Sequence, residues 1–382
     1  MIAFIATAAL AVWIGLVFAR HGFWRADMRD DRETFRPPDM WPAVTAIVPA
    51  RDEADVIARS IGSLLAQDYA GDFRVILVDD NSGDGTADIA RALPDPAGRL
   101  SIIDGAPLAD GWTGKLYAVS QGIEAAGDTP PYLWLTDADI EHAPDTLSSL
   151  VSRAEARQLV LVSLMARLAC VTFAERTLVP AFVFFFQMLY PFRAVSRAEG
   201  MGAAAGGCML VRRQALERAG SIAAVRDALI DDCAIGALMK REGHVWLGLT
   251  DRSRSVRPYV GWRPVFDMIS RSAYAQLGYR PLALAGTIAG LALVYLAPPL
   301  LTLFADGYAA TAGLIAWSLM TLSFQPMLAF YGRSPFWGIA LPAIAAIYAG
   351  ATLRSAWDHE RGKGGMWKGR AQALGTSSGT PK

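Results

Sequence analysis

The sequence predicts an α/β fold, with a mostly parallel sheet in one soluble domain and apolar helices at both ends of the chain. Two observations carry this prediction. Between residues 42 and 255, short apolar runs alternate with helix-like segments, which is typical of βαβ units. Uninterrupted apolar runs lie at both ends of the 382-residue chain, and 53% of all residues are hydrophobic. Such runs are typical of membrane helices.

The composition excludes several classes of protein. The chain has 36 basic and 36 acidic residues, so its formal net charge is zero, and a nucleic-acid partner is not expected. Three cysteines and four histidines are scattered along the chain, without a C-x-x-C motif or a closely spaced histidine pair. This pattern argues against a disulfide framework and against a zinc site.

The N-terminal run predicts a membrane anchor over residues 1–20. Residues 1–19 contain no charged side chain, and arginines follow at Arg20, Arg25 and Arg29. A signal peptide has its basic residues before the apolar run, whereas here they come after it. We therefore expect an uncleaved helix, and the arginines behind it favour a cytoplasmic location for the domain that follows.

The C-terminal third predicts membrane helices over residues 282–353. The apolar stretches are Leu282–Phe304, Ala309–Phe330 and Phe336–Leu353. Each is long enough to cross a bilayer, the last only barely. Three crossings would place the basic tail, residues 354–382, outside, although its charge favours the inside. One stretch could therefore be re-entrant, with Pro298–Pro299 as a break, and residues 256–281 are expected to lie at the membrane interface.

A fifth apolar run, residues 178–192, is rich in phenylalanine and too short to span comfortably. Its length and composition favour a helix lying in the membrane interface. A buried core helix is the alternative, because short apolar runs are often core.

The soluble part alternates between strands and helices. Its expected strands are Val44–Val48, Val75–Val78, Leu100–Ile103 and Tyr132–Leu135. Its expected helices are Glu53–Gln67, Gly85–Leu93 and Leu116–Ala126. Parallel sheets bind ligands in a crevice beyond the carboxyl ends of their strands. Polar side chains at those positions are therefore candidates for a binding site.

Three strand ends carry such residues, which we group as the expected donor and metal site. The segments are Pro49–Ala50–Arg51–Asp52–Glu53 after the first strand, Asp79–Asp80 after the second, and Thr136–Asp137–Ala138–Asp139 after the fourth. The chain contains neither a G-x-G-x-x-G nor a Walker loop, so dinucleotide and P-loop sites are not expected. The acidic strand ends suit a nucleotide together with a metal ion.

The residue types indicate how each end would act. Asp137 and Asp139 would bind Mg²⁺ or Mn²⁺, which prefer carboxylate and phosphate oxygens and neutralise a departing diphosphate. A lone D-x-D is often only a turn or a helix cap, but this one follows an apolar strand. Asp79–Asp80 could accept hydrogen bonds from a base or ribose. Lys115, in a glycine-bearing loop before a helix, could meet the diphosphate as a point charge.

Two later segments extend this site. A glycine-led strand begins at Gly206–Gly207, where glycine lets the backbone approach a ligand closely. Asp231 and Asp232 open a predicted helix that runs to Arg241, and carboxylates at that position commonly serve as caps. Because neighbouring carboxylates shift each other's pKa, we interpret Asp232 as a general base and Asp231 as the cap.

Together, the motifs resemble the family 2 glycosyltransferases, which have the GT-A fold, a Rossmann-like arrangement. The matching segments cover residues 42–255 and are Val48–Glu53, Val78–Thr86, Asp137–Asp139, Gly206–Gly207 and Asp231–Asp232. Within that family, the sequence is most similar to the hopene-associated glycosyltransferases of bacterial hopanoid pathways. The segments that carry this closer resemblance are Gly111–Lys115, Pro180–Pro191 and Ala228–Cys233.

The resemblance implies inverting transfer of a sugar, a Mg²⁺ or Mn²⁺ cofactor and a role linked to hopanoid lipids, but it does not establish the acceptor. We expect the donor to be a UDP-sugar and the acceptor to be a lipid. We expect the enzyme to lie in the bacterial inner membrane, and the arginines behind the N-terminal run favour its cytoplasmic face. By position, the resemblance implies that the nucleotide is contacted by Ala50, Arg51, Glu53 and Asp80, and that the diphosphate is contacted by Lys115. It implies that Asp137 contacts the sugar or ribose and that Asp139 binds the metal. It implies that Asp232 acts as the base. Asp231 stands where the family has glutamate. The family's Q-x-x-R-W motif is absent, and Arg271 and Tyr274 are expected to replace its acceptor residues.

Three alternatives stay open. A polyprenyl-phosphate glycosyltransferase would have a phosphate as its acceptor and would need no strong base. A membrane partner that only binds nucleotide-sugar would need none of the catalytic carboxylates. A transporter is the third, although Asp306 is the only acidic residue between Leu282 and Phe330, which leaves an ion-coupled path poorly supplied with charge.

Overall fold

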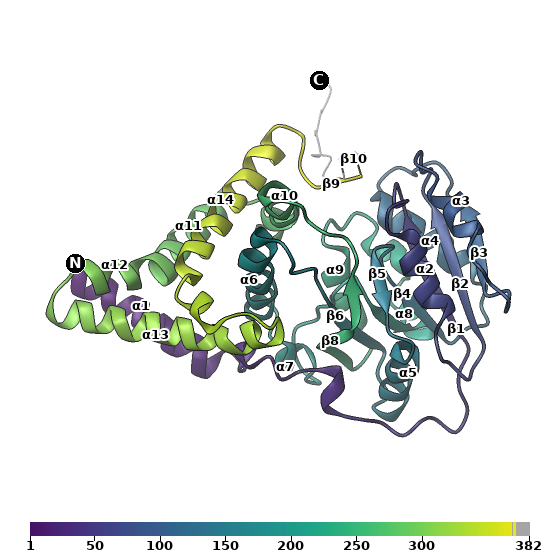
Figure 1. Cartoon of the computed structure of the whole chain (residues 1–382), viewed down its shortest axis with the longest axis horizontal. Helices are drawn as coiled ribbons and strands as arrows, with labels where there is room; N and C mark the ends of the chain where they lie inside the picture. The colour runs from purple at the N-terminus through teal and green to yellow at the C-terminus, as the bar shows by residue number, and fades with distance from the viewer. Residues whose placement is uncertain (369, 372–382) are drawn as a thin grey trace. The chain divides into compact units, whose positions relative to one another are not determined.

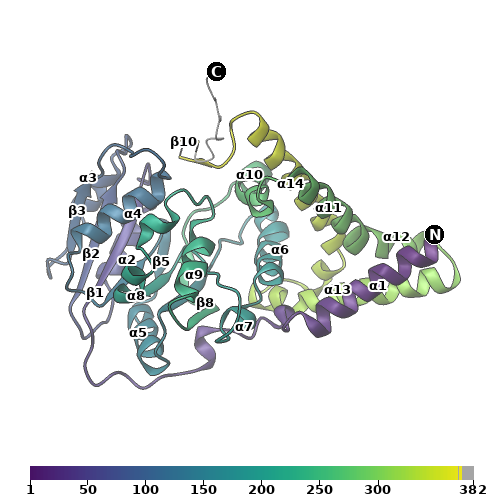
Figure 2. The ribbon, with the colours of Figure 1, turned by 180° about the vertical axis from the view of Figure 1, so that it is seen from behind.

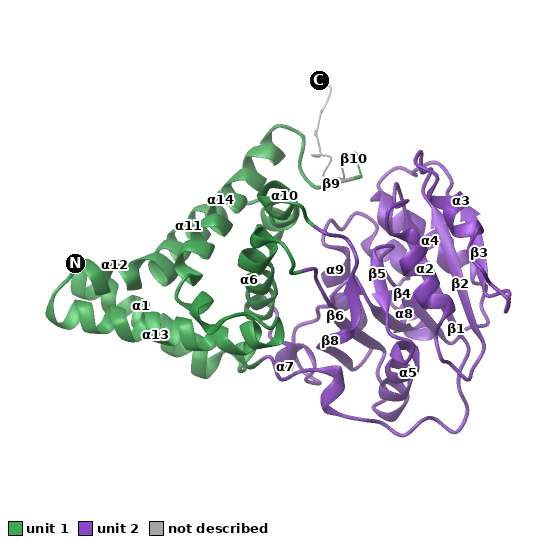
Figure 3. Ribbon diagram, in the orientation of Figure 1, with its two compact units in different colours: residues 1–25, 170–189, 259–382 green, residues 26–169, 190–258 purple. Residues whose placement is uncertain are grey.

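The computed structural model describes residues 1–368, 370 and 371, and its contacts divide the chain into two compact units (Figure 3). Unit 1 combines Met1–Arg25, Cys170–Leu189 and Tyr259–Lys382, and unit 2 combines Ala26–Ala169 and Tyr190–Pro258. Residues 369 and 372–382 of the predicted basic tail lie outside the described residues.

Unit 2 is built on a sheet of eight strands in the order β3-β2-β1-β4-β7-β6-β8-β5 (Figure 1). The strands are β1 Val44–Ala50, β2 Phe73–Asp79, β3 Leu100–Asp104, β4 Tyr132–Leu135, β5 Ile140–His142, β6 Leu161–Arg167, β7 Met209–Arg212 and β8 Val245–Ser255. The four predicted strands correspond to β1 to β4. The α/β prediction is therefore confirmed, with membrane-length apolar helices at both ends of the chain.

The sheet is mixed, and four of its seven strand pairs are parallel. β1 pairs in parallel with β2 and β4, and β2 with β3, as the alternation predicts. In the other half, β6 pairs in parallel with β8, so a mostly parallel sheet is confirmed. The exceptions are β7, which runs antiparallel to both β4 and β6, and β5, which runs antiparallel to β8. The strands β5, β6 and β8 were not predicted, and their pairing joins segments far apart in the sequence.

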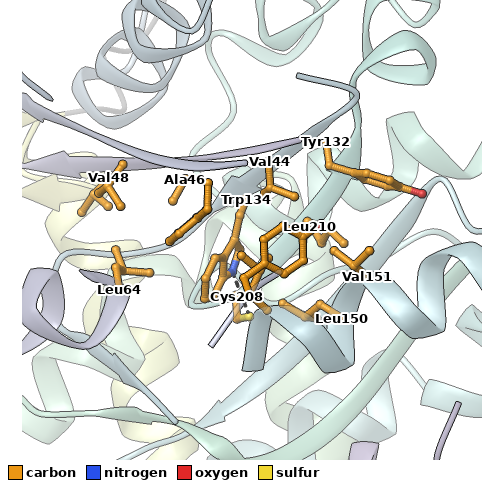
Figure 4. Close-up of a cluster of buried hydrophobic side chains, with 14 of the residues drawn as sticks. Val44, Ala46, Val48, Leu64, Tyr132, Trp134, Leu150, Val151, Cys208 and Leu210 are labelled. Atoms are coloured by element: carbon orange, nitrogen blue, oxygen red, sulfur yellow. Dashed lines mark hydrogen bonds between the residues drawn. The ribbon is translucent and has the colours of Figure 1, made fainter. Parts of the chain in front are cut away.

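Apolar strand residues form the core of unit 2 (Figure 4). All seven residues of β1 are buried, as are all four of β4. The Trp134 indole lies among Val44, Ala46 and Leu210, and its Nε1 donates to Cys208 Sγ at 3.3 Å. A buried indole N–H needs such a partner, because an unmet donor is costly. This core fixes the central strands, whose carboxyl ends carry the polar segments.

The helices of unit 2 are α2 Ile57–Leu65, α3 Thr86–Arg91, α4 Gly114–Ala125, α5 Thr146–Ala156, α7 Phe192–Val195, α8 Arg213–Arg218 and α9 Asp231–Lys240. Two predicted starts are wrong. α2 begins four residues later than predicted, since the backbone N–H groups of Glu53 and Ala54 donate to side chains of the next loop. α4 begins at Gly114, so Lys115 lies in its first turn rather than in the preceding loop.

Unit 1 is helical. Its helices are α1 Ile2–Ala19, α6 Phe173–Leu189, α10 Trp262–Ala273, α11 Pro281–Leu291, α12 Ala297–Phe304, α13 Gly307–Phe330 and α14 Leu341–Glu360. Among the residues described, three helices are long and apolar enough to cross a membrane: Ile2–Ala19, Pro281–Phe304 and Gly307–Phe330. α1 lies along α13 in both views of the ribbon (Figures 1 and 2), and Thr7 bonds to Tyr308 at 2.8 Å.

Two predictions for the C-terminal stretches need correction. Pro298–Pro299 do not break the first stretch, because a π-helical turn, Ala292–Leu296, leads directly into α12. A wider turn can accommodate the missing proline N–H. The last stretch, Phe336–Leu353, is not a candidate span. Its residues are divided between a 3₁₀ turn at Pro335–Gly338 and α14, which continues through the charged residues 354–360 of the predicted tail.

The predicted interfacial run forms most of α6, whose start is fixed by Thr172 and Glu175. The Glu175 N–H donates to Thr172 Oγ1 at 3.2 Å, and Glu175 Oε2 accepts from the Thr172 and Val171 N–H groups at 2.7 and 2.9 Å. This is a capping box. Glu175 Oε1 also accepts from the Tyr259 N–H at 2.7 Å. One buried carboxylate therefore joins two distant segments of unit 1.

We expect Glu175→Gln to destabilise the protein by about 1–3 kcal/mol, because the new amide N–H₂ must face a backbone N–H and leaves that donor unsatisfied. Thermal unfolding of the full chain in detergent would measure the loss. Glu360→Gln, at an exposed position in α14, is the matched control and should unfold like the wild type. Equal unfolding temperatures for both variants would contradict the anchoring role of Glu175.

Candidate active site

The polar segments predicted from the sequence meet at one edge of the sheet. β1 lies between β2 and β4, and the three strands are parallel. Their carboxyl ends therefore face the same way. The chain runs outward from β1 to β3 and then returns to the other side of β1 at β4. In open α/β sheets, this reversal of strand order marks the usual ligand crevice.

The loops after β1 and β2 are tied together by backbone-to-side-chain hydrogen bonds. The Asp52 N–H donates to Ser82 Oγ at 3.0 Å, and the Gly83 N–H donates to Asp52 Oδ1 at 2.9 Å. The Glu53 N–H donates to Thr86 Oγ1 at 2.8 Å. Asp52 has φ of +50°, a left-handed conformation that these bonds hold in place. The loops form one rigid wall of the edge.

Arg51, Asp79 and Asp80 line this wall. The Arg51 guanidinium donates to the Asp80 carbonyl and lies 3.6 Å from its carboxylate. Within the described residues, Asp79 Oδ1 and Arg51 Nε are buried without a hydrogen-bond partner. Such atoms are costly unless a ligand satisfies them. The pair provides one acceptor and one donor for a bound molecule, as the predicted nucleotide role requires.

Lys115 joins two carboxylates from distant parts of the chain. Its Nζ lies 2.7 Å from Asp137 Oδ1 and 2.9 Å from Asp231 Oδ2. Burial raises the pKa of Asp137, and the neighbouring ammonium opposes this. Burial lowers the pKa of Lys115, but the two carboxylates outweigh it and hold the pKa above its ordinary value. The lysine is therefore a fixed positive charge at this edge.

Asp232 lies beside this cluster at the start of α9. Its Oδ2 accepts from the Gly206 N–H at 3.0 Å and its Oδ1 from the Cys233 N–H at 2.7 Å. Burial and the charge of Asp231 raise the pKa of Asp232 to about 6, while Lys115 and the two N–H groups oppose the rise. The side chain is therefore mostly ionised at neutral pH and is more basic than an ordinary aspartate. This is what a general base requires.

The remaining predicted donor-binding residues, Pro49, Ala50 and Gly207, have no polar side-chain group and could contact a donor mainly through their backbone atoms. Pro49 and Ala50 are buried in β1, and the Ala50 carbonyl accepts from the Asp80 N–H at 2.8 Å. A Cβ on Gly207 would lie 3.0 Å from the Ala166 Cβ, so close packing leaves little room for a side chain there. Donor contacts by these three residues stay predictions.

Asp139, the predicted metal ligand, is already paired with a cation. Arg257 Nε donates to Asp139 Oδ2 at 3.1 Å, and the same guanidinium contacts the Glu53 carboxylate. Sequence reasoning missed Arg257, because nothing in its local pattern distinguishes it from other arginines near β8. It is identified by the side chains it reaches, 118 and 204 residues away in the chain.

The carboxylates fit a divalent cation only in part. Among the described residues, no group of three or more His, Cys, Asp or Glu side chains could hold a metal ion. One or two carboxylates are nevertheless enough for Mg²⁺ when substrate phosphates supply the other oxygens. Asp137 and Asp139 suit that arrangement, and both already stabilise positive charge. A metal would therefore be held jointly with a phosphate-bearing donor.

His142, next to this edge, is a second residue outside the predicted site. Its Nε2 lies 2.9 Å from Thr136 Oγ1, and its Nδ1 lies 2.9 Å from Ser253 Oγ. Thr136 uses its only hydroxyl proton for the Gly207 carbonyl, at 2.8 Å. It must therefore accept from Nε2–H, which identifies the neutral tautomer. The ring supports the loop between β4 and β5, which carries both Asp137 and Asp139.

Burial lowers the pKa of His142 to about 3, whereas in the unfolded chain it would be about 6.5. The unfolded chain therefore binds more protons between these pH values. We expect His142 to cause no change of stability with pH above pH 6.5. As the pH falls below 6.5, the free energy of unfolding should decrease by about 1.4 kcal/mol per pH unit. Chemical unfolding at pH 5 and 7 would measure this, and His142→Gln should reduce the difference. The exposed His244→Gln is the control; an equal change there would contradict the assignment.

The predicted acceptor residues lie in unit 1. Arg271 is exposed in the last turn of α10. Tyr274 is 2% exposed, its hydroxyl donates to the Tyr279 carbonyl at 3.0 Å, and its ring packs edge-on against Tyr279 and His359. The Tyr274 ring therefore has no open face for an acceptor in this structure. Acceptor roles for both residues stay predictions.

Comparisons with known proteins show which family and fold the chain is similar to. Residues 45–220 match the model of glycosyl transferase family 2. Two relatives are from Rhizobium meliloti (strain 1021). Succinoglycan biosynthesis protein ExoO is 37% identical over 122 residues, 31% of this chain and 32% of that protein. Succinoglycan biosynthesis protein ExoU is 42% identical over 60 residues, 16% of this chain and 17% of that protein. The chain thus spans about a third of the first relative and less of the second.

The fold of this chain is similar to that of a solved structure. The mannosyltransferase PcManGT from Pyrobaculum calidifontis, solved in complex with GDP-Man and Mn²⁺, superposes with a TM-score of 0.56. It is 21% identical, and the similarity covers 94% of this chain and 99% of that one. At this identity the likeness establishes a shared GT-A-like fold over nearly the whole length. The resemblance to hopene-associated enzymes has no counterpart among these matches.

Proposed function

We propose that this chain, whose residues 45–220 match the model of glycosyl transferase family 2, transfers a sugar from a nucleotide-diphosphate sugar to a hydroxyl of a membrane lipid, with inversion. The observation that carries the proposal is the convergence of Asp232 with the Lys115 cluster at one sheet edge. A base for the acceptor and a cation for the leaving group lie within one small region. Buried unpartnered atoms on Asp79 and Arg51 supply contacts for the nucleotide.

The chemistry is one displacement. Asp232 takes the proton of the acceptor hydroxyl, and the oxygen forms a bond to the anomeric carbon from the face opposite the nucleotide. The bond from that carbon to the diphosphate breaks, and its electron pair leaves with the diphosphate. Lys115 stabilises the negative charge that develops there. Mg²⁺ or Mn²⁺, held by Asp139 and Asp137 together with the phosphates, would supply Lewis-acid neutralisation of the same charge.

A lipid acceptor is supported by the helices of unit 1: within its described residues, three helices are long and apolar enough to cross a membrane. The arginines behind α1 favour the cytoplasmic side of the bacterial inner membrane for unit 2. The segments similar to the hopene-associated enzymes favour a hopanoid-related lipid. The names of both relatives favour a second acceptor class, a hydroxyl on a saccharide precursor.

Transfer assays on the purified full chain in lipid nanodiscs test the proposal. UDP- and GDP-sugars would be offered with Mg²⁺ or Mn²⁺ and bacterial lipid extract, and products followed by mass spectrometry. We expect one lipid to gain one sugar, only with metal present, and Asp139→Ala to lose the product. A sugar gained on a polyprenyl phosphate instead would favour that class of enzyme. Folded protein that neither transfers nor hydrolyses any donor would indicate a non-catalytic nucleotide-sugar-binding partner.

A further inference from the structure

Arg257 occupies the carboxylates on which the proposed metal site depends. It follows β8, and the adjacent Val256 N–H donates to the Asp139 carbonyl at 2.8 Å. That backbone bond holds the segment beside Asp139 whatever the guanidinium does. The guanidinium itself lies between Asp139 and Glu53, and the Arg257 side chain is 28% exposed. Its charge is permanent at any accessible pH.

A guanidinium and a divalent cation compete for the same carboxylate oxygens. Mg²⁺ approaches its oxygen ligands to about 2.0–2.1 Å, and the Arg257 Nε–H already donates to Asp139 Oδ2. Two cations around one carboxylate also repel each other strongly in a partly buried setting. Binding of a metal ion to Asp139 therefore favours movement of Arg257 away from this carboxylate. In the part of the chain that the structure describes, the guanidinium forms its ion pairs with these two carboxylates.

The donor would change that balance. A diphosphate brings negative charge to this edge, and a guanidinium binds phosphate through two parallel N–H···O bonds. Arg257 could then leave Glu53 and Asp139 without losing its pairing, while the vacated carboxylates meet the metal. Metal and nucleotide would each strengthen the binding of the other, because coupling between two ligands is reciprocal.

We propose that Arg257 is an internal cation that holds Glu53 and Asp139 in the donor-free enzyme and transfers to the donor diphosphate, so that metal and donor bind together. This inference rests on the proposed function. It makes the chain's affinity for a divalent cation depend on nucleotide, and it assigns that dependence to one side chain.

Mn²⁺ binding, followed by electron paramagnetic resonance of the full chain in nanodiscs, tests the inference without any turnover. The titration would use Mn²⁺ alone, then Mn²⁺ with UDP, then Mn²⁺ with GDP. For the wild type we expect Mn²⁺ affinity to rise about tenfold or more with one of the nucleotides. For Arg257→Gln we expect Mn²⁺ alone to bind about tenfold more tightly than to the wild type, with a smaller gain from nucleotide. Arg254→Gln, an exposed arginine of β8, should match the wild type.

A second measurement guards against a variant that folds poorly. Without Arg257 the carboxylates of Glu53 and Asp139 lose a counter-ion, so Arg257→Gln should unfold at a lower temperature than the wild type. Mn²⁺ should raise the unfolding temperature of the variant back toward that of the wild type. A variant destabilised without any gain in Mn²⁺ binding would make Arg257 a purely structural counter-ion and overturn the inference.

The two proposals fail in different ways. Wild-type coupling that persists unchanged in Arg257→Gln would overturn the role of Arg257 and leave the proposed metal-dependent transfer intact. Wild-type and variant chains that both fail to bind Mn²⁺ with either nucleotide would remove the metal from the proposed function, and the inference with it.

Discussion

Asp232→Asn is expected to lower the rate of sugar transfer by about 10²- to 10⁴-fold, the usual contribution of a general base. Asparagine cannot accept the acceptor proton, although it keeps the size of the side chain and one of the two bonds from Gly206 and Cys233. Nucleotide binding should change little, because no predicted nucleotide contact involves Asp232. Transfer would be measured by mass spectrometry and nucleotide binding by calorimetry.

The pH profile adds a readout that a structural role would not produce. Because burial and Asp231 raise the pKa of Asp232 to about 6, the wild-type rate should fall as the pH drops through 6. The residual activity of Asp232→Asn should lack that acidic limb. Asp227→Asn, an exposed change four residues before α9, is the control. Lost nucleotide binding in Asp232→Asn would contradict the base assignment, and full activity would favour a phosphate acceptor.

Lys115→Met is expected to have the second largest effect, a loss of about 10²- to 10³-fold in transfer. The substitution removes the cation expected to stabilise the leaving diphosphate, and it leaves the carboxylates of Asp137 and Asp231 without their shared partner. The charge of Lys115 also lowers the pKa of Asp232. Its removal should therefore move the acidic limb of the pH profile to higher pH.

Lys115→Arg is the matched control, because it keeps the positive charge next to both carboxylates. We expect it to keep the acidic limb near its wild-type position, even where geometry lowers the rate. Transfer rates from pH 5 to 9 for the three proteins would separate the two effects. A limb that stays in place in Lys115→Met would show that this lysine does not set the charge state of Asp232.

The sequence alone determined the half of the fold in which local pattern and burial agree. β1 and β4 are short apolar runs that are buried throughout, so they are predicted as strands without any knowledge of the strands beside them. The polar residues after them lie at strand ends for the same reason. The start of α9 at Asp231 is equally local, since two acidic residues favour a helix N-terminus.

Tertiary structure decided what depends on distant partners. β7 pairs antiparallel with β4 and β6, although its own sequence carries no sign of direction. The start of α2 moved because Glu53 and Ala54 bond to the loop after β2. Periodicity in a single segment cannot report such pairings, because they depend on how the whole sheet closes.

The same division holds within the site. The sequence supplied Asp137, Asp139 and Asp232, because carboxylates at strand and helix ends are visible as residue types at recognisable positions. Only the structure joined Lys115 to Asp137 and Asp231, and placed Arg257 between Glu53 and Asp139. The physical reason is that charge pairing acts through space. The sequence shows where the carboxylates are, whereas the fold determines which cation lies close enough to neutralise each of them.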